Sequence, residues 1–210
     1  MVVFLHGLWL QGREAALLRR RLRSSYGFDV DVFRYPSVTA TMEQITRELQ
    51  SFVTARAPHE LHLVGHSLGG LVAYRFLERF PEQPCGRVVF LGTPAMASRA
   101  ASAVSRMAWA RALLGHCVAE ELLSARHREW SIARELGIIA GTLPLGLGQL
   151  FVHFDEDNDG SVAVSETRLP GATDCITLPV SHFGMLLSAR VADEIGRFLT
   201  NGHFSLRAAP

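Results

Sequence analysis

The chain of 210 residues contains no lysine, although it carries 21 basic residues. All of them are arginine, so Schiff-base catalysis, attachment of pyridoxal phosphate and a P-loop are excluded, since each needs a lysine amine. An excess of charge is missing too, because 21 basic and 20 acidic residues leave a formal net charge of +1. No global field therefore draws the protein to nucleic acid or to an acidic membrane.

Cysteine is also scarce, with three residues at wide spacing: Cys85, Cys117 and Cys175. An odd, dispersed set fits reduced, buried thiols in a reducing compartment better than a disulfide framework. Long hydrophobic runs are missing as well. Only five apolar residues precede His6, too few for a signal peptide or a membrane span. We therefore expect a cytoplasmic protein without an integral membrane segment.

Short apolar stretches with strand character alternate with stretches of helical periodicity. This alternation predicts the α/β class, with a mostly parallel, doubly wound sheet covered by helices on both faces. No linker or repeat interrupts the pattern, so residues 1–210 are predicted to form a single domain. The expected strands lie at residues 2–5, 28–35, 61–64, 87–91, 137–140 and 175–178, and the expected helices at 13–25, 42–53, 68–80 and 188–201.

The most informative stretch is Gly65-x-Ser67-x-Gly69, which lies where a predicted strand gives way to a predicted helix. Such a strained turn raises a serine hydroxyl above the sheet and requires small residues on either side. With Gly-His-Ser-Leu-Gly-Gly at residues 65–70, the sequence resembles small bacterial esterases and lipases of the α/β-hydrolase superfamily. The resemblance implies the α/β-hydrolase fold and a nucleophilic Ser67.

The resembling enzymes use a serine, an acid and a histidine in that order along the chain. Ser67, Asp159 and His182 follow this order, and each comes after a predicted strand. His182 lies in Ser-His-Phe-Gly-Met-Leu at residues 181–186, a setting much like that of small lipases. In this chemistry the histidine takes the serine proton, and a buried carboxylate holds the imidazole in the correct tautomer.

The acidic loop at residues 155–166 offers a second interpretation. Asp155, Asp157, Asp159, Gly160 and Glu166 fit a calcium-binding EF-hand loop. An EF-hand also needs a helix on each side, and residues 143–148 and 168–171 contain proline and glycine that leave no room for one. We therefore predict Asp159 as the acid and no metal. Asp157 or Asp155 as the acid, and calcium bound in this loop, remain alternatives.

The resemblance also implies an oxyanion hole, which would use two backbone N–H groups. His-Gly at residues 6–7 ends the first predicted strand, so the first donor is the N–H of Leu8, and the second is that of Leu68 at the helix start. An ordinary strand end is the alternative for residues 6–7. Side chains next to these loops are candidates for the wall of an apolar acyl pocket: Trp9, Leu10, Phe183 and Met185.

Residues 95–136 are rich in alanine and arginine, and they predict two or three helices. In the resembling folds such an insertion caps the active site; an elongated crossover connection is the alternative. Altogether the sequence predicts a serine hydrolase that cleaves small-molecule carboxylic esters through an acyl-enzyme on Ser67. No metal or organic cofactor and no nucleic-acid partner is expected. An acyltransferase with the same acyl-enzyme, and a non-catalytic ligand-binding module, remain alternatives.

Overall fold

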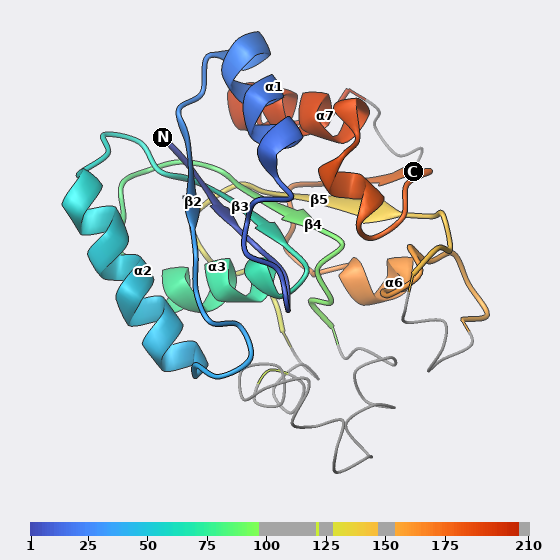
Figure 1. Ribbon diagram of the computed structural model, residues 1–210, viewed down its shortest axis with the longest axis horizontal. Coiled ribbons are helices and arrows are strands. Elements are labelled where there is room, and N and C mark those ends of the chain that lie inside the picture. The colour runs from blue at the N-terminus through green and yellow to red at the C-terminus, as the bar shows by residue number, and fades with distance from the viewer. Residues whose placement is uncertain (97–120, 122–127, 147–153, 206–210) are drawn as a thin grey trace.

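A parallel sheet forms the centre of the protein in a computed structural model, which describes residues 1–96, 121, 128–146 and 154–205 (Figure 1). Within these residues the sheet has six strands in the order β2-β1-β3-β4-β5-β6, and every neighbouring pair is parallel. The strands are β1 (Val2–Leu5), β2 (Val30–Phe33), β3 (His62–His66), β4 (Val88–Leu91), β5 (Leu136–Gly141) and β6 (Asp174–Leu178). The mostly parallel sheet predicted from the sequence is confirmed.

Helices cover both faces of the sheet (Figure 1). α1 and α7 pack together on one face, and α2 and α3 pack together on the other. A short helix, α6, lies next to β5. The helices are α1 (Ala16–Tyr26), α2 (Met42–Arg56), α3 (Leu68–Arg79), α6 (Val164–Thr167) and α7 (Ala189–Asn201), with a 3₁₀ turn, η3, at Gly184–Leu186.

Two hydrophobic clusters separated by the sheet make up the core. In β1, Val3 and Leu5 pack with α2 and α3, whereas Val2 and Phe4 pack with α1 and α7. All four side chains are completely buried. This two-sided burial explains why the strands are uniformly apolar instead of alternating.

Local signals in the sequence set most of the element ends. Thr41 and Gln44 form a capping box at the start of α2, and Gly202, with φ 80°, ends α7. The predicted strand at residues 28–35 is too long, since β2 covers only Val30–Phe33. β2 pairs with the four residues of β1, which ends at Leu5, so the strand has no partner beyond that length.

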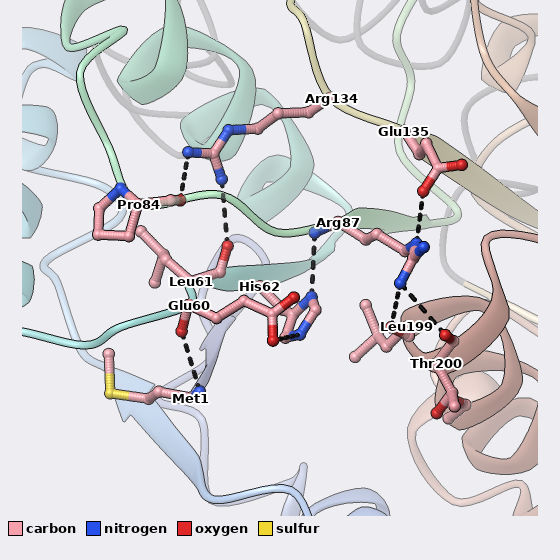
Figure 2. A network of polar contacts seen from close by, with 11 residues as sticks. Met1, Glu60, Leu61, His62, Pro84, Arg87, Arg134, Glu135, Leu199 and Thr200 are labelled. Atoms are coloured by element: carbon pink, nitrogen blue, oxygen red, sulfur yellow. Dashed lines mark hydrogen bonds and ion pairs between the residues drawn. The ribbon is translucent and has the colours of Figure 1, made fainter.

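A polar network ties the sheet together at the end opposite Ser67 (Figure 2). The backbone N–H of Arg87 donates to Nδ1 of the buried His62 over 3.0 Å. The Arg87 guanidinium contacts the Glu135 carboxylate at 2.5 Å and the Leu199 carbonyl at 2.9 Å. Arg134 donates to three backbone carbonyls, those of Leu61, Gln83 and Pro84, at 3.1, 2.8 and 2.5 Å. These contacts join β3, β4, β5 and α7 at their ends.

The structure describes only part of the insertion predicted at residues 95–136. Most of the predicted helical insertion, at residues 97–120 and 122–127, lies outside the described residues, and residues 128–135 are not helical.

The prediction of buried thiols is wrong for Cys85, which is exposed in the loop before β4, and Cys175 is half-buried. Cys117 lies outside the described residues. In the part of the chain that the structure describes, no helix is both long and apolar enough to cross a bilayer.

Candidate active site

Ser67 lies at the turn between β3 and α3, where the sequence predicts a strand-to-helix transition. Its backbone has φ 54° and ψ −120°, a conformation that L-residues rarely adopt. The turn is crowded on both sides. A side-chain carbon on Gly65 would lie 2.4 Å from the Gly70 nitrogen, and one on Gly69 would lie 2.1 Å from the Leu5 carbonyl oxygen. Only glycine fits at these two positions, so Gly65 and Gly69 are needed for the strained turn that carries Ser67.

The loop after β1 lies against Ser67. A side-chain carbon on Gly7 would be 3.2 Å from Ser67 Cβ, which shows how closely the two segments approach. The Gly7 carbonyl accepts hydrogen bonds from His6 Nδ1 at 2.9 Å and from the Leu10 N–H at 3.3 Å. In a trans peptide the N–H points away from the carbonyl, so these bonds fix the direction of the Leu8 N–H.

His6 is itself locked by Tyr35, which follows β2. The Tyr35 N–H donates to His6 Nε2 at 3.3 Å, the Tyr35 hydroxyl donates to the His6 carbonyl, and the two rings stack with centroids 4.1 Å apart. Nε2 is therefore an acceptor, and the proton lies on Nδ1, where it reaches Gly7. Burial lowers the pKa of His6, which favours this neutral form.

The second predicted donor, the Leu68 N–H, belongs to the first residue of α3. The opening N–H groups of a helix have no acceptor within the helix and carry its positive dipole end. Among the hydrogen bonds between described residues, neither the Leu8 nor the Leu68 N–H is used. No described residue therefore accepts a hydrogen bond from either group.

Asp159 and His182 meet at the same edge of the sheet. Asp159 Oδ2 lies 2.6 Å from His182 Nδ1, and the Asp159 side chain is only 1% exposed, against 16% for His182. The other carboxylate oxygen accepts the N–H groups of Ser161 at 2.9 Å and Val162 at 2.8 Å. The His182 N–H also donates to the Asp159 carbonyl at 2.8 Å. Both the side chain and the main chain of His182 are thus held by one residue.

Gly92, the residue after β4, lies against the Asp159–His182 pair. Gly92 has φ 53°, and a side-chain carbon there would lie 2.8 Å from Asp159 Oδ2 and 3.0 Å from His182 Nδ1. Ser67 is connected to β4 as well, since its N–H donates to the Leu91 carbonyl at 2.9 Å. Within the described residues Ser67 Oγ and His182 share no hydrogen bond, and in enzymes without ligand such bonds are often long.

The acidic loop does not gather its carboxylates around a common point. Asp155 and Asp157 are exposed, whereas Asp159 is buried and directed at His182. The Glu166 carboxylate accepts the Ala163 N–H at 3.2 Å, at the start of the four-residue helix α6. No group of three or more potential metal ligands occurs in the described parts of the chain. Among residues 154–167, which the structure describes, the EF-hand pattern of the sequence is therefore not accompanied by a cluster of metal ligands.

The four candidate pocket residues fall into different environments. Trp9 is 57% exposed and Phe183 is 48% exposed, close to Gly7 and His182 in the chain. Leu10 is half-buried against the core. Met185 is completely buried within the core cluster beneath α1 and α7, because η3 turns it inward, and it offers no exposed surface to a substrate.

Sequence reasoning missed Tyr35 and Gly92 as neighbours of the site. Tyr35 was visible only as the end of an apolar stretch, and Gly92 only as a glycine after a strand. His66, the residue before Ser67, also contacts the site, because its Nε2 forms a hydrogen bond with the His182 carbonyl at 2.9 Å.

A sequence profile described as the Alpha/beta hydrolase family matches residues 2–198 of the chain. The chain belongs to this family. Two rice sequences called "Probable esterase PIR7A", from Oryza sativa subsp. indica and subsp. japonica, are each 37% identical over 95 residues. The match covers 41% of this chain and 36% of the relative, so the chain spans about a third of the length of these curated relatives.

Solved structures with the same fold support the α/β-hydrolase architecture predicted from the sequence. The mature lipase BlEst2 of Bacillus licheniformis superposes with a TM-score of 0.73 at 20% identity, covering 95% of this chain and 90% of that one. A monoacylglycerol lipase of Paleococcus ferrophilus gives 0.62 at 17% identity, covering 93% and 90%. At such low identity these similarities establish the architecture and leave the substrate open.

Proposed function

We propose that the protein is a serine hydrolase that cleaves carboxylic esters through an acyl-enzyme on Ser67. The observation that carries the proposal is the 2.6 Å contact between the buried Asp159 carboxylate and His182 Nδ1, at the sheet edge where the strained Ser67 turn lies. The names of an esterase relative and of two lipases with the same fold support the same reaction class.

In the proposed first step, Ser67 Oγ attacks the acyl carbon while its proton passes to Nε2 of His182. The Asp159 carboxylate accepts a hydrogen bond from the Nδ1–H group of His182, which keeps that proton on Nδ1 and leaves Nε2 unprotonated and able to act as the base. When the imidazole becomes a cation, the adjacent carboxylate stabilises it. The proton then passes to the departing alcohol oxygen, and an ester bond joins the acyl group to Ser67.

The tetrahedral intermediate places negative charge on the former carbonyl oxygen. The N–H groups of Leu8 and Leu68 would hold this oxyanion, in the way that preorganised donors lower the barrier in acyl transfer. His6 fixes the Gly7–Leu8 peptide plane before substrate arrives. In the second step water, activated by His182, attacks the acyl carbon and releases the acid and free Ser67. The proposed mechanism uses no metal or organic cofactor.

Trp9 and Phe183 are the exposed apolar side chains nearest to this site in the chain, and they support small-molecule esters with an apolar acyl group as substrates. The test is a series of 4-nitrophenyl esters of increasing acyl length, assayed with wild type and Ser67→Ala. We expect turnover by wild type and a loss of roughly 10⁴–10⁶-fold in the variant. Near-normal turnover by Ser67→Ala would exclude this mechanism, and acyl transfer to added alcohol in preference to water would favour an acyltransferase.

A further inference from the structure

The ring of His66 connects the residue before Ser67 to the main chain of His182. His66 Nε2 lies 2.9 Å from the His182 carbonyl oxygen, and the two imidazole rings have centroids 4.7 Å apart at an angle of 46°. His66 is the last residue of β3, which pairs with β1 on one side and β4 on the other. The contact therefore runs from the middle of the sheet to the loop that follows β6.

The chemistry of this contact determines the tautomer of His66. A carbonyl oxygen only accepts, so Nε2 must carry the proton and donate it. Nδ1 is buried and has no hydrogen-bond partner among the described residues. Burial, and secondarily the nearby His182, lower the pKa of His66 to about 3, so the ring is uncharged at neutral pH. His66 is thus a neutral donor beside an imidazole that must become a cation.

These properties make His66 unsuitable as the base. Its Nε2 already donates to the His182 carbonyl, and its Nδ1 faces the backbone of Gly7, where an added side-chain carbon would be only 3.0 Å away. An imidazole that takes up a proton only near pH 3 cannot deprotonate a serine at neutral pH. The role of His66 must therefore come from the hydrogen bond that its Nε2 donates to the His182 carbonyl.

His182 lies in a segment with no regular structure, between the end of β6 at Leu178 and the start of η3 at Gly184. β6 is an edge strand of the described sheet, so this loop borders the sheet on one side only. The His182 N–H donates to the Asp159 carbonyl, and the His182 carbonyl accepts a hydrogen bond from His66 Nε2. Both main-chain polar groups of His182 are therefore held by residues of the site.

We propose that His66 is a positioning residue, which fixes the main chain of His182 so that its imidazole stays aligned between Asp159 and Ser67. This inference rests on the proposed function. Catalytic efficiency depends steeply on such alignment, because an error of about 1 Å between reacting groups can reduce the rate by about a hundredfold. The effect should appear in kcat, since His66 is only 2% exposed and presents almost no surface to a substrate.

The test compares three variants of His66 that differ in donor reach. The glutamine nitrogen in His66→Gln extends about as far as imidazole Nε2, whereas the asparagine nitrogen in His66→Asn stops near the position of Nδ1. His66→Met fills the space without a donor. We expect kcat on a short-chain 4-nitrophenyl ester to fall by about 10–100-fold in the Asn and Met variants with KM nearly unchanged. His66→Gln should restore kcat to within a few-fold of wild type.

His62→Gln is the matched control, because His62 is equally buried in the same strand but lies at its opposite end. It should change the melting temperature without changing kcat. Equal kcat in the Gln and Asn variants, or a loss confined to KM, would overturn the proposal. So would Gln and Asn variants that both fail to fold, since the ring would then be needed for the fold itself.

Failure of the proposed function would look different. If Ser67→Ala, run alongside, kept wild-type turnover, the nucleophile assignment would be wrong and His66 would have nothing to align. If Ser67→Ala were inactive while all three His66 variants matched wild type, only the positioning role would be lost. The rate of fluorophosphonate labelling at Ser67 gives an independent readout, and it should follow kcat across the series.

Discussion

Replacing Gly92 with alanine should disturb the Asp159–His182 pair directly. The added carbon would lie 2.8 Å from Asp159 Oδ2 and 3.0 Å from His182 Nδ1, the two atoms joined by the 2.6 Å hydrogen bond. Carbon atoms make ordinary contacts at about 3.5 Å, so these groups must move by roughly half an ångström or more. The carbon pushes on both partners, and their hydrogen bond is the contact that it would disrupt.

The expected magnitude has two parts. A displacement of this size in a catalytic pair should lower kcat by about 10–100-fold. Stability should fall as well, because the φ of 53° costs an L-residue about 1–2 kcal/mol and overpacking adds about 1–3 kcal/mol. We therefore expect Gly92→Ala to lower the free energy of unfolding by about 2–5 kcal/mol.

Gly27→Ala is the control for Gly92→Ala, because it has the cost of a positive φ without the steric crowding. Gly27 ends α1 with φ 71°, and an added carbon would meet no atom within 4 Å. It should lose about 1–2 kcal/mol of stability and keep wild-type kcat. Urea unfolding and steady-state ester hydrolysis would be measured on both variants. If Gly92→Ala kept wild-type kcat and lost no more stability than Gly27→Ala, the crowding deduced around the pair would be refuted.

Three further predictions test other contacts. Asp159→Asn should reduce turnover by up to about 10⁴-fold by favouring the wrong tautomer of the histidine, whereas Asp157→Asn, at an exposed carboxylate, should change it little; equal losses would refute Asp159 as the acid. The folded state lowers the pKa of His66, because the buried ring is neutral. The stability gained by burying this neutral ring should be complete above about pH 6.5 and decline as the pH falls toward 3, so that the free energy of unfolding is lower by roughly 3 kcal/mol at pH 4. Urea unfolding across this range should show a smaller decline in His66→Gln, and an identical decline would contradict the burial of a neutral ring. Arg134→Met should destabilise the fold by about 2–4 kcal/mol, since three carbonyls lose a charged donor, but leave kcat unchanged; a fall in kcat would contradict its structural role.

The sequence predicts the features that depend on local chemistry. The strand, turn and helix around Ser67 follow from glycine spacing and apolar periodicity, and the capping box of α2 follows from Thr41 and Gln44 alone. The parallel sheet follows from alternating elements, because connections of this length return each strand in the same direction. The ends of strands are less predictable, as β2 shows, because their length is decided by the neighbouring strand.

Contacts between distant segments could not be read from the sequence. Tyr35 reaches His6 only because β1 and β2 pair in register, and Gly92 meets Asp159 only because β4 and the acidic loop end at the same edge. Met185 is close to His182 in the chain, yet η3 turns its side chain into the core. The partner of His66, 116 residues away, was hidden for the same reason.

The central claim is that Ser67 is the nucleophile and is activated by His182. The most direct measurement is peptide mass spectrometry after exposure of the wild-type protein, Ser67→Ala and His182→Ala to a fluorophosphonate probe. We predict one covalent adduct in the wild type, on the peptide that carries Ser67, none in Ser67→Ala, and strongly slowed labelling in His182→Ala. An adduct on another residue, or ester turnover by a wild-type protein that the probe does not label, would contradict the claim.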